Sequence, residues 1–439
     1  MIETPRRILL ITFDVIGLRI GGSAIRVLGL ARALATKGYA PTIAAPRVET
    51  GYPEQAFSIR EFELARPREV LAALLENAEL AVVPLQGLAR LPFLGKARIP
   101  LVFDIYDPVL FELMETAPGE MRGHVQLLNR LFRRGDFFIC ASERQRAFWL
   151  DALAANGRIN TSAAADPEAR ALIDVVPFGI DPTPPPPPTN DRSFLNAAVR
   201  NVGREKVVVW PGGMWDWTDP QIVLSAMQIL GRRAAGIHIL FFAGTHPTEG
   251  HFESSALKEA RALAREFQLE GRSVHFIDDY VPYGERGRYL VECDAAVSTH
   301  RANLESHYAY RTRLLDCIWA GLPIVCTEGD VLADTVARNG FGIVVPPSDA
   351  AALAAAIERI STDENFAASC RARIAECRHL FDWNDAIEPL ARFCERPRVT
   401  HLAARGRNAG LLAESAWRVF KTRGAQETFR RLRQHLRSR

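Results

Sequence analysis

Short, continuous runs of apolar residues recur along this chain, and they restrict its fold more than any other feature. The first set of runs contains RILLITF (7–13), PTIAAP (41–46), LAVVPL (80–85), LVFDIY (101–106) and DFFICAS (136–142). The runs are apolar at successive rather than alternate positions, which predicts strands that are buried on both faces of a parallel sheet. Helical patterns separate the runs, so we expect a doubly wound α/β domain.

A second set of runs follows a proline-rich break, PTPPPPPTN, at 182–190. Consecutive prolines disfavour a helix and favour a stiff extended segment. The second set contains KVVVWPGG (206–213), IHILFFAG (237–244), VHFID (274–278), AAVSTH (295–300), PIVCTEGD (323–330) and GIVVPPSD (342–349). We therefore predict two α/β domains with a cleft between the carboxyl edges of their sheets. The predicted divisions are 1–181, a linker at 182–191, 192–395, and a basic helical tail at 396–439.

The length and the charge distribution agree with this division. A chain of 439 residues is long for one hydrophobic core, and two domains are the usual outcome. The formal charge is +3, but the stretch 400–439 alone carries ten Lys or Arg residues and only two acids. This distribution argues against a nucleic acid as partner. It predicts a basic C-terminal segment that binds an anionic membrane surface or, alternatively, packs back on the first domain.

The cysteine and histidine residues limit the disulfides and metal sites that the chain can form. The seven cysteines form no CxxC motif and mostly lie in apolar stretches, which predicts buried, reduced thiols and a cytoplasmic location. The N-terminal apolar run is too short for a signal peptide, and no stretch is long enough to cross a bilayer. The ten histidines show no metal-ligand spacing, so we expect no metal and no cofactor.

Two glycines follow the first predicted strand. Gly21 and Gly22 precede a helix that Ser23 opens, at a place where glycine allows a ligand to approach the backbone. A helix N-terminus there would offer free amides to an anion, although packing alone also explains two glycines. The pattern is not the GxGxxG fingerprint of dinucleotide-binding proteins.

Several separated segments, in order, resemble those of the family 4 glycosyltransferases, which have the GT-B fold of two Rossmann-like domains. Besides the strand, the glycine pair and the helix near the N-terminus, the similar segments are VVPFGID (175–181), CDAAVSTH (293–300), DCIWAGLPIVCTEGD (316–330) and NGFGIVVPPSDAAALAAAI (339–357). Phe178 stands where the family usually has asparagine. The resemblance covers about residues 7–395. It implies a nucleotide-sugar donor, retaining transfer, and an acceptor side that includes Gly21 and Gly22.

The donor motif of that family, two glutamates separated by seven residues, is altered in this chain. Asp316 matches the second glutamate, Tyr308 occupies the first position, and Glu305 is the nearest acid. Glu305 is therefore either a catalytic acid on a longer loop or a solvated loop residue. Arg311 and Arg313 fall where a guanidinium would clamp the donor diphosphate. Residues two apart on a helix do not share a face, so we expect only one of them to reach the ligand.

The loop PGGMWDWTDP (211–220) also departs from the family, because it lacks the usual basic residues. Gly212 and Gly213 can still offer amides to phosphate, while Asp216 is expected to bind sugar hydroxyls or to cap a turn. In the first domain, Asp107 follows a strand. It is either an acceptor-side catalytic group or part of a turn before Pro108.

These observations predict a glycosyltransferase that moves a sugar from a nucleotide sugar to a saccharide or lipid-linked acceptor. The predicted catalytic residues are Asp107, Glu305 and Arg313, and Gly212, Gly213, Asp216, Arg311 and Asp316 are expected to bind the donor. Surface polysaccharide or glycoconjugate synthesis, at the inner face of the cell membrane, is the expected setting. The alternatives are a nucleotide-sugar epimerase or a phosphorylase of the same fold, and a GT-B module that binds without turnover.

Overall fold

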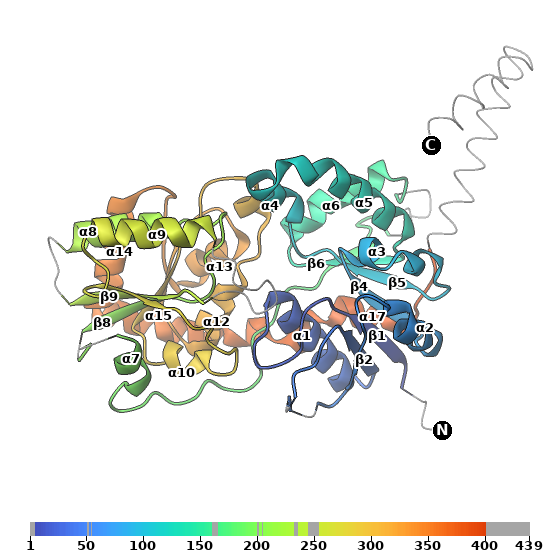
Figure 1. The fold of residues 1–439 in the computed structure, drawn as a ribbon, viewed down its shortest axis with the longest axis horizontal. Helices are drawn as coiled ribbons and strands as arrows, with labels where there is room; N and C mark the ends of the chain where they lie inside the picture. Colours follow the sequence, from blue (N-terminus) through green and yellow to red (C-terminus); the bar gives the residue numbers. More distant parts are fainter. Residues whose placement is uncertain are drawn as a thin grey trace, which may run out of the picture.

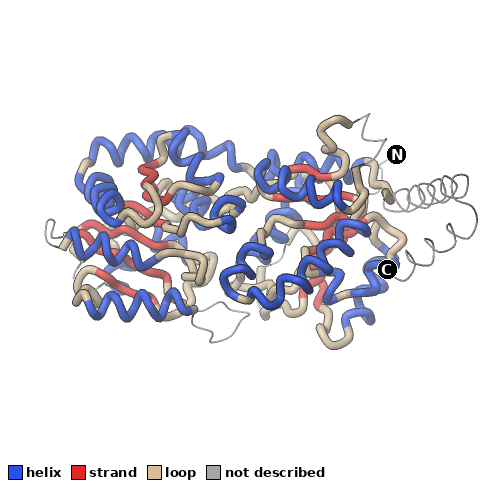
Figure 2. Tube along the Cα trace, turned by 90° about the horizontal axis from the view of Figure 1, so that it is seen from above, coloured by secondary structure: helices blue, strands red, loops and turns tan. Residues whose placement is uncertain are grey.

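The computed structural model describes residues 5–50, 52–53, 55–159, 166–199, 202–203, 205–231, 236–244 and 254–400. It consists of two lobes that lie side by side (Figure 1), each built on its own parallel sheet (Figure 2). The first sheet has the order β3-β2-β1-β4-β5-β6-β7, and the second has the order β10-β9-β8-β11-β12-β13. In each sheet the strand order reverses beside the strand that comes first in the sequence, between β1 and β4 and between β8 and β11. Open α/β sheets bind ligands at such reversal points.

The elements of the first lobe follow the expected alternation of strand and helix. They are β1 Arg7–Ile11, α1 Gly22–Thr36, β2 Ala40–Ala45, β3 Ser58–Glu61, α2 Pro67–Asn77, β4 Leu80–Pro84, α3 Gly87–Arg90, η1 Pro92–Lys96, β5 Leu101–Asp104, α4 Val109–Thr116, η2 Pro118–Glu120, α5 Met121–Arg134, β6 Phe137–Cys140, α6 Glu143–Ala155 and β7 Ile173–Val175.

The second lobe repeats the pattern and ends in a series of helices. Its elements, with the helices that follow, are α7 Ser193–Ala198, β8 Lys206–Trp210, α8 Pro220–Leu230, β9 Ile237–Phe242, α9 Ser255–Glu266, β10 Val274–Ile277, α10 Arg286–Leu290, β11 Ala295–Ser298, α11 Leu304–Tyr308, α12 Thr312–Ala320, β12 Ile324–Thr327, α13 Val331–Asn339, β13 Gly342–Val345, α14 Ala350–Thr362, α15 Glu364–Cys377, η4 Arg378–Phe381, α16 Trp383–Ala386 and α17 Glu388–Glu395.

The predicted α/β fold and the predicted buried strands are confirmed. Each apolar run contains a strand, and the strands pair in parallel, for example β8 with β9 from Lys206–Ile237 to Trp210–Phe241. β6 and β9 are buried along their whole length, as continuous apolar runs require. The sequence did not predict β3, because SIRE is a polar strand at the edge of its sheet.

Side chains cap the starts of two helices, α8 and α6. The Asp219 carboxylate accepts a hydrogen bond from the Ile222 amide at 3.4 Å and caps α8, which Pro220 opens. Ser142 Oγ accepts from the Gln145 amide at 3.2 Å, and the Gln145 side chain accepts from the amide of Ala141 at 2.8 Å. These two bonds fix the start of α6 at the carboxyl edge of the first sheet.

The last two helices return to the first lobe, although the stretch 192–395 was expected to form the second domain. Phe393 of α17 stacks on Phe137 of β6 with ring centroids 4.6 Å apart, and Figure 1 shows α17 beside the strands of the first lobe. Trp383 of α16 packs on the backbone of Gly29 and Gly179, where an added Cβ would approach the indole to 2.4 and 2.6 Å. Glycine at both positions therefore allows the chain to cross between the lobes.

The cysteine prediction is confirmed, since all seven thiols are free and buried. None of the described helices is long and apolar enough to cross a membrane. The described chain ends at Thr400, whose amide donates to the Asp136 carboxylate at 2.7 Å. The rest of the predicted basic tail, 401–439, lies outside the described residues.

A buried histidine pair predicts how stability depends on pH. His238 Nδ1 and His275 Nε2 are 3.0 Å apart, and burial followed by the neighbouring His238 lowers the pKa of His275 to about 4. In the unfolded chain the His275 side chain binds a proton near pH 6.5, whereas in the folded protein it does so only near pH 4. The free energy of unfolding therefore keeps its full value above about pH 6.5 and falls as the pH drops from there towards 4. We expect a loss of at most about 3 kcal/mol, measured by denaturant unfolding at pH 7 and pH 4.5.

Exposed His379 supplies the control for this prediction. The H379Q variant should lose stability with falling pH as the wild type does, whereas H275Q should lose clearly less. Equal pH dependence in H275Q and the wild type would contradict this assignment.

Candidate active site

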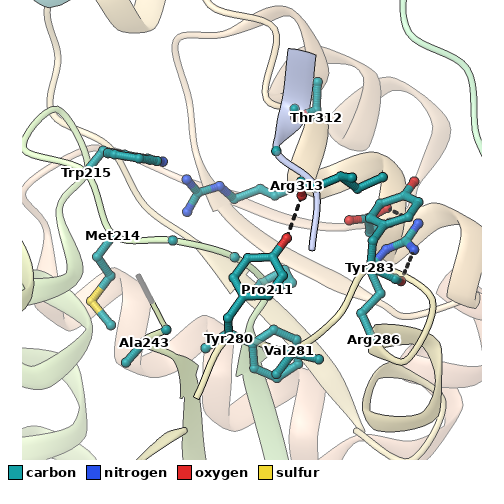
Figure 3. Close-up of a pocket in the computed structure, with 18 of the residues that line it drawn as sticks. Pro211, Met214, Trp215, Ala243, Tyr280, Val281, Tyr283, Arg286, Thr312 and Arg313 are labelled. Carbon is teal, nitrogen blue, oxygen red and sulfur yellow. Dashed lines mark hydrogen bonds and ion pairs between the residues drawn. The ribbon is translucent and has the colours of Figure 1, made fainter. Parts of the chain in front are cut away.

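A cavity of about 290 Å³ lies between the two lobes (Figure 3). The second lobe provides most of its wall, from the segments that follow β8, β9 and β10 and from the start of α12, and the first lobe provides the start of α1. The carboxyl ends of several parallel strands thus meet at the cavity, as the fold class predicts. Gly21, Gly22, Gly212, Gly213, Arg313 and Asp316, which were expected in the site from the sequence, all line it.

The cavity presents backbone amides to a ligand. Gly212 has φ of +123°, a conformation that side chains rarely adopt, and an added Cβ would meet no atom within 4 Å. The helices α1 and α12 begin at the cavity, and neither N-cap residue, Gly21 nor Arg311, caps its helix with a side chain. At α12, however, the amides of Thr312 and Leu314 already donate to the carbonyls of Tyr310 and Arg311. The start of α1 is therefore the helix N-terminus that favours an anionic ligand.

Arg313 brings a positive charge to the same cavity, and Figure 3 shows its side chain reaching towards the centre. Its Nη1 atom is buried and has no hydrogen-bond partner among the described residues. The guanidinium lies 5.2 Å from the centre of the Trp210 ring. Burial and the nearby charge of Arg311 lower the pKa of Arg313 to about 10, so it stays positively charged at neutral pH.

Arg311 occupies a different environment. Its guanidinium donates to the two carboxylate oxygens of Glu305 at 2.8 and 2.5 Å, and to Ser306 Oγ at 3.1 Å. Arg311 does not line the cavity, so of the two arginines only Arg313 reaches it. The alternative in which Glu305 is a solvated loop residue is wrong, because its side chain is only 2% exposed. The pair stabilises the loop that leads into α12 rather than contacting the cavity.

A second arginine at the cavity, Arg286, was missed by the sequence analysis. Its Nη2 donates to the Asp316 carboxylate at 2.8 Å, and its guanidinium lies 3.1 Å from the centre of the Tyr283 ring. The pair holds the Asp316 carboxylate at the cavity wall. No motif identified Arg286, because it becomes relevant only when the fold brings α10 against α12.

Two other predicted site residues lie elsewhere. The Asp216 carboxylate accepts a hydrogen bond from the Ala256 amide at 3.0 Å, so it caps α9 instead of facing the cavity. Asp107 does not line the cavity either, and it lies with Glu112 near the Glu305–Arg311 pair. Trp215 lines the cavity and stacks on Trp217 with parallel rings 5.4 Å apart.

Tyr280 joins the two lobes at the edge of the cavity. Its hydroxyl donates to the carbonyl of Ile20, just before the glycine pair, as the dashed line in Figure 3 shows. The Tyr283 amide also donates to the carbonyl of Leu18, at 3.2 Å.

We expect Tyr280→Phe to raise the KM for the donor by roughly 5- to 10-fold, because one interlobe hydrogen bond contributes about 1 kcal/mol. Steady-state kinetics would measure the change, and an unaltered KM would contradict this role.

Within the described parts of the chain, no group of three or more His, Cys, Asp or Glu side chains is arranged to hold a metal ion. In the part of the chain that the structure describes, the charged groups that line the cavity are Arg313, Arg286 and Asp316. Arg286 is paired with Asp316, whereas Nη1 of Arg313 has no hydrogen-bond partner among the described residues, so the described lining carries a net positive charge. Together with the amides at the start of α1, this charge suits a diphosphate.

Comparisons with known proteins agree with this geometry. Residues 205–363 match the family model "Glycosyl transferases group 1". No curated protein sequence matches the chain. Among solved structures, sucrose-phosphate synthase from Thermosynechococcus elongatus is similar at a TM-score of 0.65 and 17% identity, over 89% of this chain and 98% of that one.

Two further structures have the same fold. HepE of Anabaena, in complex with UDP-glucose, has a TM-score of 0.65 and 16% identity, over 89% of this chain and 99% of that one. WaaG, described as a glycosyltransferase involved in lipopolysaccharide biosynthesis, has a TM-score of 0.61 and 14% identity, over 88% of this chain and 98% of that one. The two lobes therefore form a GT-B fold, and the family match lies within the lobe that supplies most of the cavity.

Proposed function

We propose that this chain is a GT-B glycosyltransferase and that it transfers a sugar from a nucleoside diphosphate sugar bound in the cavity between its lobes. The observation that carries the proposal is the buried Nη1 atom of Arg313 at the cavity, which has no hydrogen-bond partner among the described residues. A charged group that is buried without a partner is costly, and an anionic ligand in the cavity would remove that cost. The UDP-glucose complex of HepE, a structure of the same fold, supports a nucleoside diphosphate sugar as the ligand class.

The residues at the cavity suggest how the donor is held. The diphosphate would lie between Arg313, the amides of Gly212 and Gly213, and the start of α1 at Gly21 and Gly22. Asp316, oriented by Arg286, has an acceptor-only carboxylate that suits the hydroxyl groups of a ribose. Trp215 offers an aromatic face to a sugar at the same cavity.

Catalysis then follows from stabilisation of the leaving group. When the bond between the sugar and the diphosphate breaks, negative charge accumulates on the diphosphate, and Arg313 and the amides stabilise that charge more in the transition state than in the ground state. The acceptor hydroxyl would attack from the side of the first lobe, with retention of the anomeric configuration. This arrangement supplies positive charge without a divalent cation, so the proposed reaction needs no metal and no cofactor.

The acceptor is proposed to be a saccharide or a lipid-linked saccharide used in surface polysaccharide or glycoconjugate synthesis. The role of WaaG in lipopolysaccharide biosynthesis supports this class. The excess of Lys and Arg in 401–439 supports an anionic membrane surface on the cytoplasmic side as the place of the reaction.

We expect the protein to sediment with phosphatidylglycerol vesicles only when residues 401–439 are present. If a chain truncated after Thr400 sediments with the vesicles to the same extent, the proposed membrane contact is contradicted.

The test of the proposed function uses mass spectrometry with a panel of nucleotide sugars and EDTA in the buffer. We expect transfer only when a saccharide or lipid-linked saccharide acceptor is present, and no change of the donor alone. Conversion of the donor to an isomer without acceptor would instead indicate an epimerase. Donor binding without any transfer would indicate a silent binding module, and transfer that EDTA abolishes would contradict the metal-independent mechanism.

A further inference from the structure

The connection between β8 and α8, residues 211–219, is held in place by hydrogen bonds to other parts of the second lobe. Ser254 Oγ donates to the carbonyl of Met214 at 2.6 Å. At the other end, the Asp219 amide donates to the carbonyl of Thr299 at 3.0 Å, and Thr299 Oγ1 donates back to the carbonyl of Asp219 at 2.6 Å. The backbone of this connection is therefore fixed against the start of α9 and the end of β11.

Two tryptophans of this connection stack on each other. The rings of Trp215 and Trp217 are nearly parallel, with an angle of 5° between them and centroids 5.4 Å apart. Thr218 closes the turn that contains them, because its amide and its Oγ1 both donate to the carbonyl of Trp215, at 2.9 and 2.6 Å. Trp215 lines the cavity, whereas Trp217 does not. Trp217 thus supports the ring that a ligand would contact and limits its rotation.

The side chains of this connection suit an uncharged part of the donor. Residues 211–219 contain no Lys or Arg, and the Asp216 carboxylate is engaged at the start of α9. The face of an indole carries partial negative charge, so it attracts the partly positive C–H bonds of a sugar ring and not a phosphate. The exposed aromatic surface at this wall of the cavity therefore favours a sugar.

The cavity offers different surroundings on the two sides of Arg313. Figure 3 shows the Arg313 side chain extending towards Trp215, with Tyr283 and Arg286 on its other side. On that other side, Arg286 is paired with the Asp316 carboxylate at 2.8 Å. A nucleoside diphosphate sugar has its diphosphate in the middle, its nucleoside at one end and its sugar at the other. A diphosphate at Arg313 would therefore place the ribose near Asp316 and the sugar near Trp215.

We propose that Trp215 is the platform for the transferred sugar and that Trp217 is the positioning residue that holds this platform. The inference rests on the proposed function, since it assigns the two ends of the donor within the same cavity. The ligand class is a pyranosyl group whose axial C–H bonds form an apolar face, which packs against the indole of Trp215. Trp217 contacts no part of the donor and acts only through its stack with Trp215.

Isothermal titration calorimetry of the full-length protein with UDP-glucose and with UDP tests the assignment, because only the first compound carries a sugar on its diphosphate. Trp215→Ala should weaken the binding of UDP-glucose by about tenfold and leave that of UDP unchanged. Trp217→Ala should show the same selective loss, by about threefold. W215F and W217F keep an aromatic ring and should retain most of the affinity. Phe366→Ala, at a half-buried residue of α15 outside the cavity, is the matched control and should bind both compounds as the wild type does.

A W215A variant that loses affinity for both compounds equally, or for neither, would overturn the inference, because a merely structural role of Trp215 would not distinguish them. So would a W217A variant that binds UDP-glucose as tightly as the wild type. If an alanine variant does not fold, Trp215→Leu or Trp217→Leu, which keeps apolar bulk without the ring, decides the question by the same comparison. A wild type that binds UDP but not UDP-glucose would overturn only this inference, whereas one that binds neither would contradict the proposed function as well.

Discussion

Arg313→Ala is expected to lower kcat/KM for sugar transfer by about 10²- to 10³-fold, the range seen when a preorganised charge-stabilising group is removed. The loss should fall mainly on kcat, because Arg313 interacts most strongly with the diphosphate as it accumulates charge. The fold should remain intact, since Nη1 of Arg313 has no hydrogen-bond partner among the described residues and relief of that buried charge costs no stability. Steady-state kinetics with circular dichroism would measure both effects.

Two further variants test whether the effect is specific to the guanidinium of Arg313. Arg313→Lys keeps the charge but loses the planar fork, so it should recover only part of the activity. Arg338→Ala removes an exposed arginine from α13, in the same lobe, and should leave the kinetics unchanged. Activity of R313A within threefold of the wild type would contradict the role assigned to Arg313.

The second large effect concerns stability. Asp104→Ala is expected to lower the free energy of unfolding by about 3–5 kcal/mol, because it leaves the Arg26 guanidinium buried without its partner. Arg26 is 1% exposed and donates to both Asp104 oxygens, at 2.5 and 2.9 Å, and to the Val176 carbonyl at 2.9 Å. It also lies over the rings of Tyr106 and Phe178. The pair thus connects α1 to β5, and Arg26 also connects α1 to Val176, which follows β7 where the chain leaves the first lobe.

A double variant separates the cost of breaking the pair from its net contribution. Burial raises the pKa of Asp104 despite the opposing charge of Arg26, so the ionised pair recovers only part of its desolvation cost. Arg26→Met combined with Asp104→Leu should therefore lose clearly less stability than Asp104→Ala alone in urea unfolding. An equal or larger loss in the double variant would mean that the ion pair itself provides the stability.

Most of the fold was predictable because its signals are local. Buried parallel strands are continuous apolar runs, and helix starts such as Asp219–Pro220 carry their own caps. β3 escaped prediction because an edge strand needs no buried face. The return of α16 and α17 to the first lobe was also missed, since the contact of Trp383 with Gly29 joins residues more than 300 positions apart and leaves no local pattern.

The candidate site was predictable only in part, because four of the expected residues, Asp107, Asp216, Glu305 and Arg311, do not line the cavity. Glycine pairs at strand-to-helix turns identified both loops of the cavity, because only glycine suits a backbone such as that of Gly212. The sequence could not separate Arg313 from Arg311, since the difference lies in the pairing of Arg311 with Glu305 inside the fold. Arg286 and Tyr280 were missed for the same reason, as their partners Asp316 and Ile20 are distant in the sequence.

A crystal structure of the protein with UDP-glucose would show whether the cavity between the lobes binds the donor. We expect a diphosphate in that cavity, within hydrogen-bond distance of the Arg313 guanidinium and of the amides at Gly212 and Gly213. A nucleotide bound elsewhere on the protein, or a diphosphate in the cavity that leaves Arg313 without contact, would contradict it.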